Sequence, residues 1–253
     1  MVLAPGDAAI GILVTAVLAA VAVRAEALTV RAGVTAFAFG AVIVAIGGFP
    51  FLALLALFVV ASVLATRFRI DEKTRRHVQE GTRGERGVSN VLSHIVVPLV
   101  LVLWAWWAPT MLPPKALGVL YASALAFGAS DTFASEFGVL AGGARSILSG
   151  QPVTPGTNGG ISAAGELWAL IGALLTAIVA LALFIVFGVP VTAAAGFLLV
   201  VTASGFIGCH IDSVLGAALE NRGFLTKGGT NFLSMTASVL VSAALLALVV
   251  GWP

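Results

Sequence analysis

Residues 32–66 read AGVTAFAFGAVIVAIGGFPFLALLALFVVASVLAT, which is two apolar runs without a charged side chain, separated by Gly47-Gly48-Phe49-Pro50. The hydrocarbon core of a bilayer is about 30 Å thick, so a helix needs roughly 20 apolar residues to cross it. Glycine and proline mark tight turns, and proline is favoured at the first position of a helix, so Pro50 is expected to open the second run. The stretch therefore predicts a hairpin of two membrane-spanning helices.

The same length criterion predicts eight spans in the whole chain. They cover approximately residues 7–23, 32–48, 50–66, 88–108, 115–140, 161–187, 190–218 and 231–251. A second hairpin turn is predicted at Gly188-Val189-Pro190. We expect an all-α, polytopic helical transmembrane bundle that forms a single domain over residues 1–253. The first span is too polar at its start, and too closely followed by further spans, to be a cleaved signal peptide.

The composition agrees with this fold class. Of the 253 residues, 60% are hydrophobic and 9% are charged, whereas soluble domains carry about 25% charged residues. These values exclude a soluble globular protein, a disordered chain and a nucleic-acid binder. The apolar runs are continuous rather than alternating, which excludes a transmembrane β-barrel. The single cysteine, Cys209, excludes a disulfide framework and a cysteine-based metal site.

The basic residues predict the orientation of the bundle, because cytoplasmic loops carry an excess of lysine and arginine. In the eight-span order, Lys115 falls on one side and every other basic residue falls on the opposite side. These are Arg24, Arg31, Arg67, Arg69, Lys73, Arg75, Arg76, Arg83, Arg86, Arg145, Arg222 and Lys227. We therefore expect a basic cytoplasmic loop over residues 67–87, a cytoplasmic glycine-rich loop over residues 141–160, and both termini outside the cell membrane.

Carboxylates inside the predicted spans are costly, and by default they mark function. Asp131 and Glu136 lie in the fifth span, Glu166 near the start of the sixth, and Asp212 near the end of the seventh. Ser135 shares a helix face with Asp131. Glu136 lies about 140° round the helix from Asp131, so the two converge only on a shared ligand or through a local break. All four acids fall toward the cytoplasmic ends of their spans.

A glycine-rich segment on the same side suits phosphate. The segment Thr154-Pro155-Gly156-Thr157-Asn158-Gly159-Gly160 leads into a predicted helix N-terminus, where free backbone N–H groups bind anions. Carboxylates are ligands for Mg²⁺, which also takes phosphate oxygens from substrates. Basic loops add donors for phosphoryl oxygens. Acids, glycines and cations on one face predict Mg²⁺-dependent phosphoryl or nucleotidyl transfer to a lipid.

Several of these residues have a purely structural alternative. Asp131 and Glu136 could form an ion pair or a proton relay, and Glu166 could simply complement the dipole of its helix. The residues Gly156–Gly160 could be a plain turn. His94 and His210 are expected to be hydrogen-bonded packing residues.

The remaining candidates flank the fourth and eighth spans. Arg83 and Arg86 adjoin the fourth span and are candidates for nucleotide or headgroup binding, and Asn90 on the next turn is a candidate ligand. Asn231 is expected to open the eighth span, either as a neighbour of the N-cap or as a substrate contact.

Three segments resemble a known family. They are Asp131-Thr-Phe-Ala-Ser-Glu136-Phe-Gly138, Pro155-Gly-Thr-Asn-Gly-Gly-Ile-Ser162-Ala-Ala-Gly165 and Gly205-Phe-Ile-Gly208-Cys-His-Ile-Asp212-Ser213-Val-Leu-Gly216. They resemble the integral membrane family that contains plant phytyl-phosphate kinase with its archaeal and bacterial relatives, and the resemblance covers residues of about 30–250. More distantly, the chain resembles the CTP-dependent phytol and dolichol kinases and phosphatidate cytidylyltransferase.

The resemblance implies an isoprenoid-phosphate kinase. It would transfer the terminal phosphate of a nucleoside triphosphate, with CTP the expected donor, to an isoprenoid monophosphate of the phytyl or geranylgeranyl type. It implies that Asp131, Glu136 and Asp212 hold Mg²⁺ and the triphosphate. Phosphate binding is assigned to Gly156, Thr157, Asn158, Gly159, Gly160, Arg83 and Arg86. Substrate orientation is assigned to Asn90, Ser135, Glu166, Ser213 and Asn231, and the lipid tail to an apolar groove between spans.

The chain departs from the family pattern at two places. Residues 90–95 read Asn-Val-Leu-Ser-His-Ile, where relatives often show Gln-Val-Leu-Ala-Asn-Gly. Gln151 stands where relatives often carry a basic residue, so either Arg145 substitutes for it or that phosphate contact is absent.

Two other functions stay open at this point. One is a cytidylyltransferase that makes a CDP-lipid. The other is a cation- or proton-coupled transporter in which Asp131, Glu136 and Asp212 carry the ion. Transporters favour inverted repeats and charges at the midplane, and the acids here cluster toward one face, so the transporter ranks below the enzymes. A homo-oligomer is compatible with the sequence.

Overall fold

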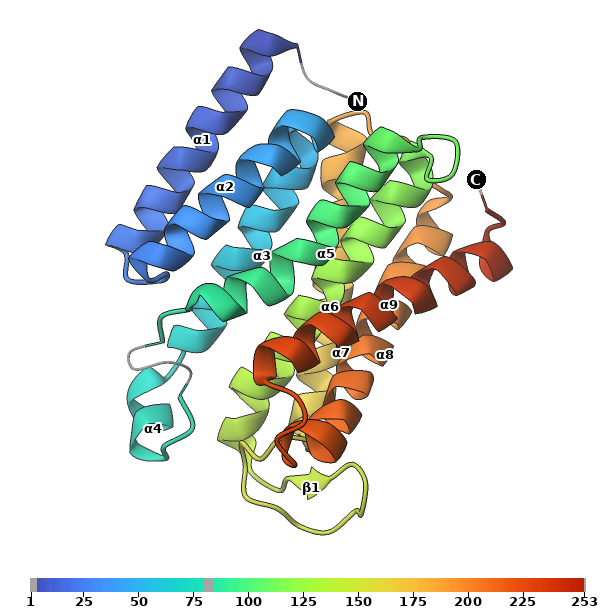
Figure 1. Cartoon of the computed structure of the whole chain (residues 1–253). Coiled ribbons are helices and arrows are strands. Elements are labelled where there is room, and N and C mark those ends of the chain that lie inside the picture. Colours follow the sequence, from blue (N-terminus) through green and yellow to red (C-terminus); the bar gives the residue numbers. More distant parts are fainter. Residues whose placement is uncertain (1–3, 80–83, 253) are drawn as a thin grey trace.

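The computed structural model describes residues 4–79 and 84–252, which form a bundle of long helices (Figure 1). Within these residues, 8 helices are long and apolar enough to span a membrane. They are α1 (Pro5–Arg24), α2 (Val30–Gly47), α3 (Phe49–Arg67), α5 (Val88–Trp107), α6 (Pro114–Ala141), α7 (Ala163–Val186), α8 (Ala194–Leu215) and α9 (Lys227–Val249). The predicted all-α fold with eight spans is confirmed.

Shorter elements lie in the two predicted loops. Helix α4 (Ile70–Arg75) lies within residues 67–87, and strand β1 (Arg145–Ser146) pairs antiparallel with strand β2 (Gly160–Ile161). A π-helical turn, η1 (Gly216–Glu220), continues α8. Figure 1 shows α4 and β1 at one end of the bundle, here called the loop end, and the two chain termini at the opposite end.

Turn and cap residues explain where the helices begin. Pro50 lies in the first turn of α3, as predicted, behind Gly48, whose φ is 93°. Helix α9 begins at Lys227, earlier than predicted, because the Thr226 hydroxyl accepts a hydrogen bond from the Gly229 N–H at 3.2 Å and caps the helix. Asn231 therefore lies inside α9, and its interpretation as the residue that opens the span is wrong.

Helix α6 is the centre of the bundle. It packs against α3, α5, α7, α8 and α9. Of the residues in its apolar 18-residue stretch, 89% are buried inside the protein. Small residues allow this close packing. A Cβ added to Gly172 of α7 would lie 2.7 Å from the Ala129 carbonyl oxygen, and one added to Gly205 of α8 would lie 2.8 Å from the Ala126 backbone. Both neighbours therefore contact the backbone of α6 directly.

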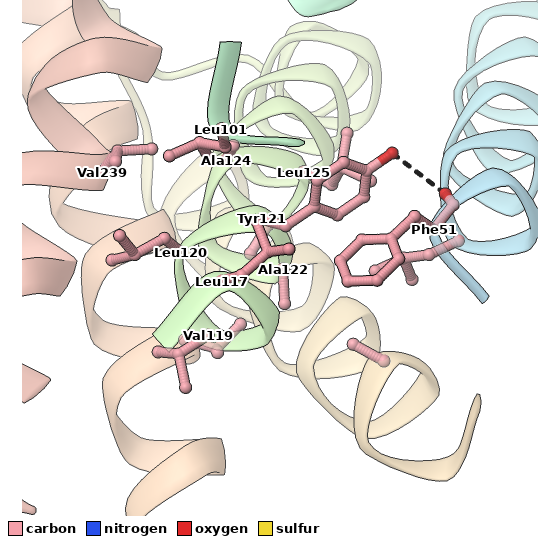
Figure 2. Close-up of a cluster of buried hydrophobic side chains, with 14 of the residues drawn as sticks. Phe51, Leu101, Leu117, Val119, Leu120, Tyr121, Ala122, Ala124, Leu125 and Val239 are labelled. Carbon is pink, nitrogen blue, oxygen red and sulfur yellow. Dashed lines mark hydrogen bonds between the residues drawn. The ribbon is translucent and has the colours of Figure 1, made fainter. Parts of the chain in front are cut away.

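The core on the other side of α6 contains one polar anchor (Figure 2). Tyr121 is fully buried, and its hydroxyl donates a hydrogen bond of 2.9 Å to the carbonyl oxygen of Phe51 in α3. The rings of Tyr121 and Phe51 meet edge to face with centroids 4.8 Å apart. A buried hydroxyl without a partner is unfavourable, so this bond fixes α3 against α6 while apolar side chains fill the rest of the contact.

We predict that Gly172→Ala destabilises the bundle, because the new methyl group meets the α6 backbone. Overpacking of this kind costs about 1–3 kcal/mol, which thermal unfolding of the detergent-purified protein would detect. Gly6→Ala is the control, because nothing lies within 4 Å of the added Cβ, and alanine favours the helix. Equal unfolding temperatures for the two variants would contradict close packing of α7 on α6.

Candidate functional site

A polar cavity of about 210 Å³ opens at the loop end, with room for more than a single water molecule. Helices α6, α7, α8 and α9, the turn η1 and the segment 155–160 surround it. Most of the residues predicted for the site line it. They are Asp131, Ser135, Glu136, Gly156, Thr157, Asn158, Gly159, Gly160, Glu166, Asp212, Ser213 and Asn231. Tertiary folding therefore brings together segments that lie up to a hundred residues apart.

Asp131 and Asp212 are the central acids of the cavity. Asp131 comes from α6 and Asp212 from α8, and the two carboxylates are close enough to interact electrostatically with each other and with Cys209, which also lines the cavity. The Oδ1 atom of Asp212 is buried and has no hydrogen-bond partner in the part of the chain that the structure describes. A buried carboxylate oxygen without a partner is unfavourable, and it offers a ligand position to a cation.

The donor set fits a magnesium ion that shares its coordination with a substrate. Among residues 4–79 and 84–252, no group of three or more His, Cys, Asp or Glu side chains is arranged to hold a metal ion. Mg²⁺ is commonly bound by one or two carboxylates together with waters and substrate phosphates. Asp131 and Asp212 provide such a pair. The expected third ligand, Glu136, has other partners.

Glu136 belongs to a buried network on the side of α6 that faces α3 and α4. Its Oε2 accepts a hydrogen bond of 2.7 Å from Lys73 Nζ, and its Oε1 accepts one of 2.7 Å from the Thr66 hydroxyl. Lys73 is fully buried, and Glu136 is 7% exposed. Glu136 therefore forms an ion pair, as in the structural alternative. Its partner is Lys73 rather than a residue of its own span.

Lys73 also closes the end of α3. Its Nζ donates to the carbonyl oxygens of Ala65 at 2.8 Å and Thr66 at 3.1 Å, which lack partners within the last turn of a helix. No sequence pattern predicts this role, because Lys73 looks like the other cations of the basic segment. Only the position of α4 against the end of α3 distinguishes Lys73 from these cations.

Arg86 and Asn90 extend the same network. Arg86 donates to the Thr66 hydroxyl at 3.1 Å and to Asn90 Oδ1 at 3.0 Å. Neither residue is among the described residues that line the cavity. Arg83, predicted beside them, lies outside the described residues. His94, one turn beyond Asn90, is buried, lies 2.9 Å from the Asn90 carbonyl oxygen, and stacks on Phe58 as expected for a packing histidine.

Glu166 joins α7 to α8 at the edge of the cavity. Its Oε2 lies 2.8 Å from His210 Nε2, and His210 Nδ1 lies 3.0 Å from the Phe206 carbonyl oxygen. Both ring nitrogens thus face oxygen atoms, and the imidazole links the start of α7 to α8. Glu166 does more than complement the dipole of α7, since it holds a specific side chain of the neighbouring span.

The glycine-rich segment is fixed against the junction of α8 and η1. Asn158 donates from Nδ2 to Glu220 Oε1 at 2.9 Å, and Asn221 donates to the Asn158 carbonyl oxygen at 3.1 Å. Gly159 has φ +74°, and an added Cβ would lie 2.6 Å from the Ser213 carbonyl oxygen and closer still to Ala217. The π-helical turn, a feature often found at functional sites, thus receives the loop that forms one wall of the cavity.

Arg145, the candidate to substitute for a basic residue near Gln151, lies outside the cavity lining. Its Nη1 donates to the Gly150 carbonyl oxygen at 3.0 Å, and the side chain is exposed. It is not among the described residues that line the cavity.

These features define a polytopic helical membrane protein with an acidic cavity at one end of its bundle. The chain belongs to the integral membrane protein family DUF92, whose model matches residues 13–248. It is 28% identical over 89% of its length to the uncharacterized membrane protein MJ0933 of Methanocaldococcus jannaschii, covering 88% of that protein.

Two further relatives come from a plant and a bacterium. The chain is 33% identical to Protein PGR of Arabidopsis thaliana, over 70% of this chain and 67% of that protein. It is 30% identical to the uncharacterized membrane protein sll0875 of a Synechocystis strain, over 70% of this chain and 66% of that protein. The names of these three relatives state no enzymatic activity, and no solved structure matches the chain.

We predict that Lys73→Met destabilises the protein, because it leaves the buried carboxylate of Glu136 without its cation. Breaking one side of a buried ion pair costs about 3–5 kcal/mol. The double variant Lys73→Met/Glu136→Gln should recover part of the loss, as measured by thermal unfolding in detergent. Lys115→Met, at an exposed position, serves as the control. Strictly additive losses in the double variant would show that the pair is not coupled.

We also predict that Gly159→Ala loosens the glycine-rich segment. Gly159 and Gly150 both have positive φ, +74° and +67°, but nothing lies within 4 Å of a Cβ added to Gly150. Gly150→Ala therefore reports backbone strain alone, and Gly159→Ala reports strain plus the clash with α8. Limited proteolysis of residues 141–160 should be faster in Gly159→Ala. Equal cleavage rates in the two variants would argue against the contact.

Proposed function

We propose that this protein is a Mg²⁺-dependent phosphotransferase of the cell membrane that converts an isoprenoid monophosphate into its diphosphate. The phosphate donor is a nucleoside triphosphate. CTP is the expected donor, because three motifs of the chain resemble phytyl-phosphate kinase. The proposal rests on one observation above all. The Asp131 and Asp212 carboxylates approach each other in a polar cavity of an otherwise apolar bundle, and Oδ1 of Asp212 has no partner among the described residues.

The arrangement of the cavity supports polyphosphate chemistry. Two like charges brought together within a membrane span are unfavourable unless a cation joins them. Asp131 and Asp212 are the residues that would hold Mg²⁺, and the bound ion would neutralise charge on the phosphoryl oxygens. The segment Gly156–Gly160 borders the same space, where it can contact phosphate groups.

The reaction needs positioning more than acid–base chemistry. An oxygen of the acceptor monophosphate attacks the terminal phosphorus of the donor, a new P–O bond forms, and the bond to the bridging oxygen of the donor breaks. The nucleoside diphosphate leaves, and no proton has to be removed from a dianionic acceptor. The residues of the cavity therefore contribute by orienting the two phosphates and by compensating their charge.

The location of the cavity supports a cytoplasmic active face. It opens at the end of the bundle that carries α4 and the segments 67–87 and 141–160, and these segments contain most of the basic residues. Cytoplasmic loops are the ones enriched in lysine and arginine. Nucleoside triphosphates are then available on the side where the cavity opens, and the isoprenoid acceptor reaches it from the surrounding lipid.

We predict that the detergent-purified protein, given Mg²⁺, CTP or ATP labelled in the terminal phosphate, and geranylgeranyl or phytyl monophosphate, forms a labelled lipid diphosphate. Asp131→Asn and Asp212→Asn should each lower the rate at least 100-fold, because each removes charge at the point where the phosphates meet. Asp71→Asn, an exposed acid on α4, should retain full activity.

Other products would identify the alternatives. A CDP-lipid with release of pyrophosphate would replace the kinase by a cytidylyltransferase. Flux of protons or cations into proteoliposomes that is lost in Asp131→Asn, without any lipid product, would indicate a transporter. Full activity in both aspartate variants would reject the proposed site.

A further inference from the structure

Lys227 is the cation of the cavity. Of the lysine and arginine residues that the structure describes, it is the one that lines the space between α6, α7, α8 and α9. The acids that line the same space are Asp131, Glu136, Glu166, Asp212 and Glu220. The positive charge of Lys227 interacts electrostatically with Asp212, which lines the same space.

The other cations considered for phosphate binding have different positions. Lys73 binds Glu136, Arg86 binds Thr66 and Asn90, and Arg145 binds Gly150. An acidic cavity repels a polyphosphate unless positive charge compensates its lining. Lys227 can supply such charge directly to a phosphate oxygen.

Local helix chemistry does not explain a lysine at this position. Lys227 is the first residue of α9, directly after the cap residue Thr226. The N-terminus of a helix carries partial positive charge, so it favours aspartate and glutamate and disfavours lysine. A residue that runs against a local preference is often found at a functional site. The same partial charge adds to that of Lys227 in attracting an anion.

The backbone of Lys227 is held in place. A Cβ added to the next residue, Gly228, would overlap the hydroxyl of Ser89 in α5, so the start of α9 lies directly against the start of α5. Asn231 is one turn further along α9, on the same face, is 4% exposed and lines the cavity. A side chain on such a rigid support can hold a ligand with little loss of entropy.

We propose that Lys227 binds a phosphate group of the polyphosphate substrate beside the Asp131–Asp212 pair. This inference rests on the proposed function. The alternative is that Lys227 only neutralises Asp212. The two roles differ in their consequence for a magnesium polyphosphate, because loss of Lys227 weakens its binding only if Lys227 contacts a phosphate group.

The test is isothermal titration of the detergent-purified full-length protein with Mg²⁺ alone and with inorganic tripolyphosphate in excess Mg²⁺. Lys227→Met should weaken tripolyphosphate binding about 10-fold or more, the effect of losing one charged hydrogen bond. It should leave Mg²⁺ binding unchanged or tighter, because a nearby positive charge is removed. Lys227→Arg should bind tripolyphosphate nearly as well as the native protein. Lys115→Met, at the opposite end of the bundle, should match the native protein.

Two results would overturn the inference. One is tripolyphosphate binding by Lys227→Met equal to that of the native protein, and the other is a native protein that binds no magnesium tripolyphosphate. Lys227→Gln is the second variant if Lys227→Met does not fold. A native protein that binds tripolyphosphate through Lys227 but forms no lipid diphosphate would retain this inference and reject the kinase, so the two failures are distinguishable.

Discussion

The burial of α6 is the constraint on which the rest of the structure depends. Lipid gives little hydrophobic drive for one helix to associate with another, so close packing and satisfied polar groups must hold the bundle together. Gly172 and Gly205 let α7 and α8 contact the α6 backbone, and Tyr121 anchors α3 on its other side. This packing brings Asp131 of α6 toward Asp212 of α8, so the contacts that stabilise the fold also assemble the cavity.

Acids at the loop end are accommodated in two different ways. Glu136 is buried with Lys73 and Thr66, and each of its oxygens accepts a hydrogen bond, so it ties α6 to α3 and α4. Asp212 lies beside another carboxylate and keeps a buried oxygen without a partner in the described chain. An ion pair with all its hydrogen bonds made favours a fixed structure, whereas two neighbouring negative charges favour the binding of a cation. This difference separates the structural acid from the candidate binding acids.

The cavity wall also depends on irregular backbone. The segment 155–160 fits against η1 through Asn158, Gly159 and Glu220, and the start of α9 fits against α5 through Gly228. Irregular backbone is tolerated near a membrane where it is covered by protein or lines a polar space. These contacts hold the phosphate-binding candidates, the loop and Lys227, in the lining of the cavity that contains the two aspartates.

The sequence by itself determined the number and approximate limits of the spans, because bilayer thickness sets the length of an apolar helix. It also identified four of the five described acids that line the cavity, because charge inside a span is rarely tolerated without a role. The tertiary structure decided the partners. That Glu136 binds Lys73, that Glu166 binds His210, and that Lys227 rather than Arg145 lines the cavity all depend on side chains from separate segments meeting in space. Hydropathy and spacing describe each helix alone, whereas such pairs are set by how helices pack on one another.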